Sequence, residues 1–309
     1  MKIAFFTEMN FRGMVPMDHK NMRTEFAWMA ALNAYHYNIN AIPSEQYDLG
    51  IVILPKKSPE QFDINKLKKY CKQVAVMQEG PNWYYQDYSV ENQMKYLEHL
   101  INADIVYCHN IADCRYYKGL LDSKNVFVMN TLMITDMIDT GKLCKPADRD
   151  NVIVGGNFCS WYSGIDSYMI AQEFNTKIYA PKMGRMSENE KLVEDLNHIE
   201  YKNWLDWIYE LSKFKYAVHL MRTHAAGTFA LNCAYLGIPC IGYEGLDTQF
   251  MCHPELTVDM GDMEAARALA KLLATDEDFY NECSKTAQEL YTLNFGVDNF
   301  MYLFDNSIN

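Results

Sequence analysis

The sequence lacks a long apolar run, a paired-cysteine motif and an excess of positive charge. No window of about 18 or more uninterrupted apolar residues occurs, which excludes a membrane-spanning helix of ordinary length. The nine cysteines are scattered, odd in number and without a CxxC pair, so we expect reduced structural thiols and no structural zinc site. With 28 basic and 40 acidic side chains the net charge is −12, which opposes nonspecific attraction to phosphate backbones.

The chain also lacks a recognisable secretory signal. Its start, MKIAFFTEMNFRG, has one lysine and a short apolar run without a small-residue cleavage site, which is typical of a first strand. We therefore expect a cytoplasmic protein, in the host cytoplasm if it is viral, with no membrane partner. Neither an internal repeat nor a low-complexity tract is present. A hydrophobic content of 49% over 309 residues is globular, and the length accommodates two domains.

Short apolar runs alternate with segments of helical spacing along the whole chain, which predicts an α/β protein with mostly parallel, doubly wound sheets. The loop at 8–19 is expected to be flexible, and the charged segment 145–150 to be a linker. Predicted strands lie at 2–7, 49–54, 74–77, 105–108, 126–129, from 152, 177–180, 216–220 and 238–241. Predicted helices lie at 21–35, 59–72, 90–102, 112–121, 163–174, 204–214, 229–236, 262–274, 276–290 and 295–304.

The stretch 215–249, KYAVHLMRTHAAGTFALNCAYLGIPCIGYEGLDTQ, organises the second half. Its apolar strand is followed by a polar loop, a helix that ends at Gly237 and a second strand, which together form a βαβ unit. The start of that helix, at Gly227 and Thr228, exposes unpaired N–H groups that suit a phosphate or diphosphate. Arg222 adds a charged fork at the same rim. The alternative is an ordinary crossover of an α/β sheet.

This stretch resembles the donor-binding segment of GT-B glycosyltransferases, in which a helix opens with a small-residue loop and ends in Gly-x-Pro. Gly237, Ile238 and Pro239 match that end. The resemblance implies two Rossmann-like domains that face each other across a cleft. It departs at His224 and Asn232, where many members carry acidic residues. The second acid usually grips the donor ribose, and Asn232 offers a weaker hydrogen bond.

A second glycine loop follows the strand at 152. Gly155 and Gly156, in NVIVGGNFCS, provide backbone donors for a phosphate. This segment is similar to the GG-S-F-x-S segment of phage DNA β-glucosyltransferases, which implies donor contacts from the two glycines, Asn157 and Ser160. The first strand with its loop, the Leu246-Asp247-Thr248 triplet and Glu79 also resemble that family in order. Cys159 and Trp161 stand where the family has arginines, which places more of the diphosphate charge on Arg222.

Glu79 follows a central predicted strand, where the resemblance implies the catalytic carboxylate. As a general base it would take a proton from an acceptor hydroxyl as that oxygen attacks the anomeric carbon, and direct attack inverts the configuration. The alternative is a structural loop residue. The aromatic residues that follow it, from Trp83 to Tyr88, either stack on an acceptor or belong to the core. His19, Lys20 and Arg23 either contact acceptor phosphates or form a solvated helix start.

We therefore expect an inverting glycosyltransferase that uses a nucleotide diphosphate sugar, with a UDP-sugar as first expectation; a divalent metal stays open and is not indicated by the residues. The favoured acceptor is a hydroxymethylated pyrimidine in duplex phage DNA. The alternatives are a saccharide or small-molecule acceptor, or a non-catalytic nucleotide-sugar sensor. The expected domains are 1–145 on the acceptor side and 151–290 for the nucleotide sugar. Residues 291–309 are expected to pack back on the first domain.

Overall fold

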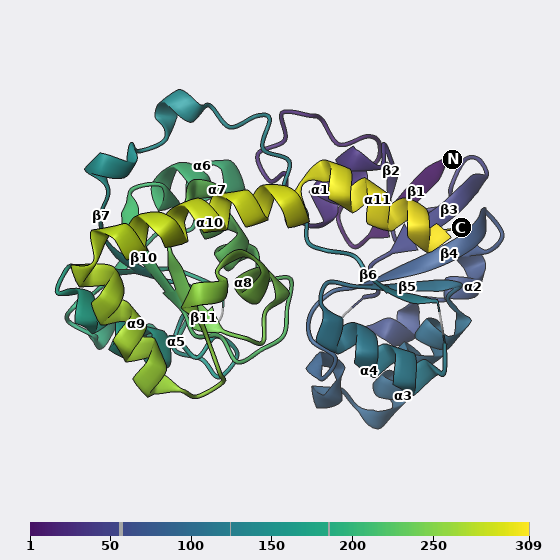
Figure 1. The fold of residues 1–309 in the computed structure, drawn as a ribbon. Helices are drawn as coiled ribbons and strands as arrows, with labels where there is room; N and C mark the ends of the chain where they lie inside the picture. Colours follow the sequence, from purple (N-terminus) through teal and green to yellow (C-terminus); the bar gives the residue numbers. More distant parts are fainter. Residues whose placement is uncertain (56–57, 124, 185, 309) are drawn as a thin grey trace. The chain divides into compact units, whose positions relative to one another are not determined.

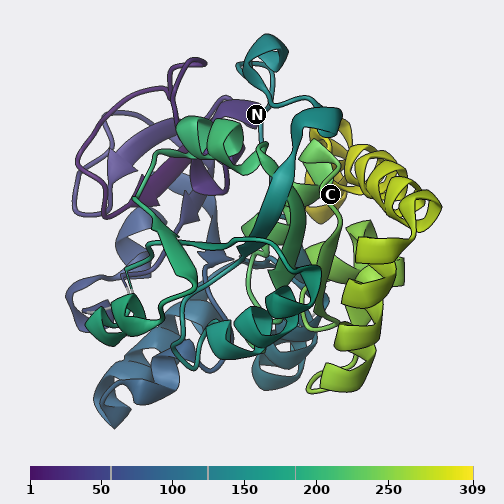
Figure 2. The same cartoon turned by 90° about the vertical axis from the view of Figure 1, so that its left-hand side faces the viewer.

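The computed structural model describes residues 1–55, 58–123, 125–184 and 186–308. The fold divides into two compact units. The first consists of residues 1–134 and 297–309, and the second of residues 135–296. Each unit contains one six-stranded, parallel sheet with helices on both faces (Figure 1, Figure 2). No helix in the described ranges has the length and apolarity that a membrane crossing requires.

The first unit has the strand order β2-β1-β3-β4-β5-β6. Its strands are β1 (Ile3–Thr7), β2 (Tyr35–Asn38), β3 (Tyr47–Val52), β4 (Cys71–Gln78), β5 (Ile105–Cys108) and β6 (Val126–Val128). Its helices are α1 (Glu25–Ala31), α2 (Ile64–Leu67), α3 (Val90–Asn102), α4 (Ile111–Leu121) and α11 (Val297–Ile308).

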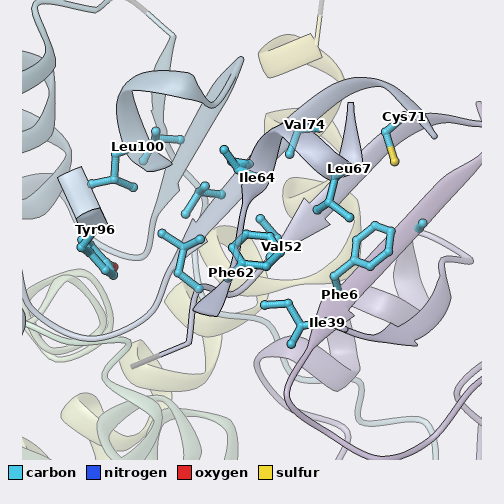
Figure 3. Close-up of a cluster of buried hydrophobic side chains, with 14 of the residues drawn as sticks. Phe6, Ile39, Val52, Phe62, Ile64, Leu67, Cys71, Val74, Tyr96 and Leu100 are labelled. Carbon is cyan, nitrogen blue, oxygen red and sulfur yellow. The ribbon is translucent and has the colours of Figure 1, made fainter. Parts of the chain in front are cut away.

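One face of this sheet packs against α2, α3 and α4. Phe6, Val52 and Val74 project from three strands into a cluster that includes Leu67 of α2 and Leu100 of α3 (Figure 3). All five side chains are almost completely buried. Because side chains alternate along a strand, the residues between them point to the opposite face and need a separate cover.

The opposite face is covered by α1 and by α11, the last helix of the chain. The ring of Phe300 lies 5.1 Å from that of Trp28, and Phe304 packs on Tyr107 of β5. The hydroxyls of Tyr107 and Ser307 are 2.9 Å apart and hydrogen-bonded. These contacts place the aromatic C-terminal segment in the first unit.

The second unit has the strand order β12-β11-β10-β7-β8-β9. Its strands are β7 (Asp150–Val154), β8 (Ile178–Pro181), β9 (Leu196–Ile199), β10 (Phe214–His219), β11 (Cys240–Tyr243) and β12 (Thr257–Val258). Its helices are α5 (Gly164–Ala171), α6 (Trp204–Leu211), α7 (Thr228–Leu236), α8 (Asp247–Cys252), α9 (Met263–Thr275) and α10 (Glu277–Phe295). Helices α5 and α9 cover one face of the sheet, and α6 and α7 the other (Figure 1).

The segment expected as a linker lies inside the second unit. Its Pro146–Asp148 part is a short 3₁₀ helix, and Asp150 already begins β7. Arg149 donates hydrogen bonds to the carbonyl oxygens of Leu236 and Gly237, at 2.7 and 3.2 Å. A cation at a helix C-terminus is stabilising, so Arg149 caps α7 and is not part of a free connection.

Two predicted helices are much shorter than their apolar spacing suggested. The helix expected at 21–35 occupies only α1, because Asn33 turns the chain at φ 49° and Tyr35 pairs with Ala4 as strand β2. The helix expected at 59–72 is reduced to a 3₁₀ turn and α2, because Cys71 already pairs with Tyr47 in β4. Strand pairing, which is a tertiary interaction, overrides local helical spacing in both places.

The loop at 8–19, expected to be flexible, is held to β2. Gly13 and His36 form an antiparallel bridge, and the His36 ring donates through Nδ1 to the carbonyl oxygen of Phe11 at 2.9 Å. The other ring nitrogen therefore accepts from the Thr7 hydroxyl, also at 2.9 Å. Strands β9 and β12, which are short edge strands, were not predicted.

Helix α11 offers a direct test of how the first unit is held together. Phe304 is 1% exposed and Tyr302, on the same helix, is 66% exposed. Phe304→Ala should lower the free energy of unfolding by about 3–5 kcal/mol because it leaves a cavity against the sheet. Tyr302→Ala should change it by less than about 0.5 kcal/mol. Urea unfolding followed by circular dichroism measures both; equal losses would contradict the packing.

Candidate functional site

The strand order of the second unit has a topological switch point between β7 and β10. From β7 the chain crosses to β8 on one side, whereas from β10 it crosses to β11 on the other. In open parallel sheets, ligands bind beyond the carboxyl ends of the strands at such a switch point. The two loops that leave this point are 155–163 and 220–227, which contain six of the eight donor-site residues predicted from the sequence; Thr228 and Asn232 lie in α7.

The N-terminus of α7 is an uncompensated positive end. Its N-cap is Gly227 at φ 69°, with no side-chain cap, and its first turn carries no acidic residue. The carbonyl oxygen of Gly227 accepts a 2.9 Å hydrogen bond from the Thr248 hydroxyl, and Thr228 is half-buried. Unpaired N–H groups and the helix dipole together make this end suitable for an anion. Gly237 ends the helix at φ 63°, as predicted.

The glycine loop after β7 is tightly packed and partly satisfied by the protein itself. A Cβ on Gly155 would lie 2.4 Å from the ring of His219, and one on Gly156 would lie 2.5 Å from Tyr162. The buried Glu190 accepts a 3.0 Å hydrogen bond from the backbone N–H of Phe158. One backbone donor of the predicted phosphate loop is thus already bonded to a carboxylate.

Asn157 and Ser160 lie differently in this loop. Asn157 is 1% exposed, and neither polar atom of its side chain has a partner among the described residues. Its backbone carbonyl accepts from Gly164 at 3.1 Å, which closes the loop onto α5. Ser160 is exposed. The structure thus buries Asn157 within the loop and leaves Ser160 at the surface.

Arg222 is held by an acidic residue that the sequence analysis did not select. Its guanidinium donates to Asp166 of α5 at 2.8 Å, and the hydroxyl of Tyr243 lies 3.3 Å from the same carboxylate oxygen. This bond raises the pKa of Arg222. The Arg222 side chain is 54% exposed, so the remaining guanidinium donors stay accessible to a phosphate.

The two positions where GT-B members carry acids are both oriented by neighbours. Asn232 is buried, and its side-chain oxygen accepts from the indole of Trp204 at 3.3 Å. A ribose contact through Asn232 would therefore use its amide N–H groups. The Nδ1 of His224 lies 2.6 Å from the carbonyl oxygen of Gly245. Because a carbonyl oxygen can only accept, Nδ1 is the donor in this hydrogen bond.

Glu79 lies in the first unit directly after β4 and is half-buried. It lines a small pocket with the aromatic residues that follow it. Tyr84 and Tyr88 are half-buried there, whereas Tyr85 belongs to the core, where it stacks on Tyr96 with ring centroids 4.9 Å apart. The other lining residues are Ile53, Leu54, Met77 and Gln78.

A second carboxylate, Glu25, interacts electrostatically with Glu79 and was not predicted as a site residue from the sequence. Burial raises the pKa of Glu25, and the nearby charge of Glu79 raises it further. Thr24, whose hydroxyl donates to Glu25, has φ 48°, an unfavourable conformation for a β-branched residue. Two carboxylates with different environments can hold different protonation states. The sequence signal was limited to a Thr-Glu pair at a helix start.

The basic cluster of His19, Lys20 and Arg23 is only partly available for contact with phosphates. His19 stacks on Phe26, with ring centroids 4.2 Å apart, and its Nδ1 accepts from the backbone N–H of Asn21. Arg23 forms a β-bridge with Met133, while Lys20 is exposed. Among the described residues, no group of three or more His, Cys, Asp or Glu side chains could hold a metal ion.

Comparisons with known proteins are informative at the level of structure. No family model and no curated protein matches the sequence. An alpha-glucosyltransferase in complex with UDP and a 13-mer DNA containing a HMU base is similar at a TM-score of 0.67 and 14% identity, over 100% of both chains. Anabaena Alr3699/HepE, solved with UDP-glucose, gives a TM-score of 0.70 at 10% identity over 100% of this chain and 99% of its own.

The chain has the GT-B glycosyltransferase fold. This confirms the fold class predicted from the sequence, two sets of parallel strands and helices of the Rossmann type. The GT-B protein TarM is also similar, with a TM-score of 0.65 and 12% identity over 84% of this chain. The chain spans about half the length of TarM, since the match covers 54% of that protein.

A substitution at Gly227 tests whether Thr248 constrains the turn before α7. A Cβ at this position would lie 2.0 Å from the Thr248 hydroxyl, whereas one on Gly261, at φ 88°, would meet nothing within 4 Å. Gly261→Ala should cost about 1–2 kcal/mol of unfolding free energy for the left-handed conformation alone. Gly227→Ala should cost about 1–3 kcal/mol more through overpacking. Urea unfolding compares the two; indistinguishable losses would mean that Thr248 does not constrain this turn.

Proposed function

We propose that this chain is a glycosyltransferase that moves a sugar from a nucleotide diphosphate sugar, in the first place a UDP-sugar, to a hydroxyl group. The favoured acceptor is the hydroxymethyl group of a modified pyrimidine in DNA. The observation that carries the proposal is the uncompensated N-terminus of α7 at the switch point between β7 and β10. An exposed, charged Arg222 stands in the loop that leads to it.

The donor side of the proposal lies in the second unit. The diphosphate would bind the free N–H groups at Gly227 and Thr228 and the accessible donors of Arg222. Gly155 and Gly156 allow close approach of the backbone, and Asn157 and Asn232 offer amide groups to the nucleoside. Structures of similar fold were solved with UDP or UDP-glucose, which supports a uridine nucleotide.

The acceptor side lies in the first unit. Glu79 would accept the proton of the acceptor hydroxyl while that oxygen forms a bond to the anomeric carbon. The bond from this carbon to the diphosphate oxygen breaks, and UDP leaves with the electron pair. One direct displacement inverts the configuration, so UDP-glucose, which is α-linked, would give a β-glucoside. Burial and the charge of Glu79 raise the pKa of Glu25, which favours its neutral form and so limits negative charge at the site.

DNA as acceptor is supported by the full-length similarity to an alpha-glucosyltransferase solved with DNA. A stacked base would have to be flipped out, at a cost of a few kcal/mol, and the half-buried Tyr84 and Tyr88 beside Glu79 provide surfaces for it. The net charge of −12 favours a second candidate, a saccharide or small-molecule acceptor. HepE, solved with UDP-glucose, and sucrose-phosphate synthase are also similar in fold.

The function is tested by sugar transfer from labelled donors. The purified protein is incubated with a panel of UDP-sugars and with duplex DNA that contains hydroxymethylcytosine, hydroxymethyluracil or unmodified bases. We expect label only in hydroxymethylated DNA, and less of it as salt rises. Donor binding without incorporation into DNA would move the proposed acceptor to the saccharide or small-molecule class. Donor binding with neither sugar transfer nor donor hydrolysis would favour a non-catalytic sensor. The anomeric proton coupling of the product shows inversion or retention.

Glu79→Gln keeps the shape of the side chain and removes its basicity. Donor affinity should be unchanged, while turnover should fall by roughly 10²-fold or more. Asp87→Asn, an exposed acid eight residues later in the same segment, is the matched control and should retain normal turnover. Steady-state rates and donor titrations measure both. If the Glu79 variant keeps near-normal turnover, another residue is the base.

A further inference from the structure

His219 is a buried polar residue at the switch point that the proposed chemistry does not use. It is the last residue of β10 and is 3% exposed. Its ring lies against Gly155, where a Cβ would come within 2.4 Å, and 5.0 Å from the ring of Phe229 in the first turn of α7. The imidazole is therefore wedged between the glycine loop and the anion-binding end of α7.

Neither ring nitrogen of His219 has a hydrogen-bond partner in the described part of the chain. The other buried histidines there behave differently: His253, for example, donates through Nε2 to the carbonyl oxygen of Ala230 at 3.1 Å. A neutral imidazole has one donor and one acceptor, and leaving a buried polar group unpaired is costly. A buried ring without a partner from the protein is unusual and requires a partner from outside the chain, a water molecule or a ligand.

No charged side chain compensates His219 in the ligand-free protein. Burial alone lowers its pKa to about 4, so the ring is neutral at pH 7. The charged groups on the packed elements include Asp166 of α5 and Arg222 after β10, which pair with each other, and the buried Glu190, which accepts from the backbone N–H of Phe158 in the glycine loop. His224 stands in the same loop as Arg222, and its ring is bonded to Gly245. The first turn of α7 contributes no acid.

We propose that His219 is the floor of the diphosphate site and takes up a proton from solvent when a nucleoside diphosphate sugar binds between the glycine loop and α7. This inference rests on the proposed function, because it requires a diphosphate at that end of α7. A dianionic ligand over a buried imidazole favours the imidazolium form and gives a charge-assisted hydrogen bond. Affinity must then fall as pH rises, because the protonated ring is the binding form.

The test measures protons directly. UDP-glucose is titrated into the protein by calorimetry at pH 6, 7 and 8, in buffers with different heats of ionisation. UDP-glucose is chosen because its diphosphate does not itself titrate in this range. We expect net proton uptake by the wild-type protein and an affinity that decreases with pH. His219→Gln should abolish the uptake, flatten the pH dependence and weaken binding at pH 6 by roughly tenfold or more.

Two further variants separate the sources of the proton. His253→Gln changes another buried histidine whose pKa burial also lowers to about 4, and it should leave the uptake intact. His224→Gln removes the half-buried histidine of the same loop and should also leave it intact. Loss of uptake in the His224 variant with retention in the His219 variant overturns the assignment.

The titration of the wild-type protein tests the proposal even if His219→Gln does not fold. Binding of UDP-glucose without proton uptake, and with the same affinity at all three pH values, overturns the role of His219 and leaves the proposed function in place. Absence of binding for UDP-glucose and for UDP would count against the proposed function and the inference together.

Discussion

The proposed donor site of the second unit depends on a single electrostatic constraint, the N-terminus of α7, which has no side-chain cap. A helix start without a side-chain cap or an acidic first turn is stabilised only by water or by a bound anion. The fold maintains this unsatisfied end at Gly227, whose carbonyl is fixed by Thr248. The opposite end of the helix is fully compensated, since Arg149 and Ser284 both donate to the carbonyl of Gly237. The helix is thus anchored at its C-terminus and available at its N-terminus.

Two carboxylates near the switch point, Asp166 and Glu190, are already engaged by the protein. Asp166 is paired with Arg222, and Glu190 accepts from two backbone N–H groups, those of Phe158 and Ser187. Acidic groups engaged in this way repel an incoming diphosphate less than free carboxylates would. A chain with a net charge of −12 can therefore still present a local anion site.

In the first unit, backbone strain at Thr24 and burial of Glu25 occur close to a second carboxylate, Glu79. Thr24 has a positive φ, and its neighbour Glu25 has a raised pKa to which the charge of Glu79, in the tyrosine-lined pocket, contributes. The backbone around Thr24 is fixed by bonds from Thr24 to Leu132 and from Ile134 to Met22. Strained residues persist only where the surrounding structure overdetermines them, and they are frequent at functional sites.

Local sequence determined the elements whose signals are local. The helix at 90–102 and the strand at 105–108 were predicted with their observed bounds, because amphipathic spacing and a short apolar run are unambiguous there. Gly237 was predicted as a helix end because the left-handed conformation favours glycine. The GT-B fold followed from the alternation of strands and helices and from the Gly-x-Pro motif, while the donor and acceptor roles of individual residues stay predictions.

Tertiary structure decided everything that depends on partners distant in sequence. Only pairing with β1 makes Tyr35–Asn38 a strand, and only the sheet face at Trp28 and Tyr107 places α11 in the first unit. The partner of Arg222 is 56 residues away, and the ring of His219 meets Gly155 across two neighbouring strands. The sequence by itself determined the alternation of strands and helices and several of their bounds, because these signals are local. Which side chains are neutralised, buried or left without a partner is a property of packing, because charge compensation and burial are set by neighbours in space.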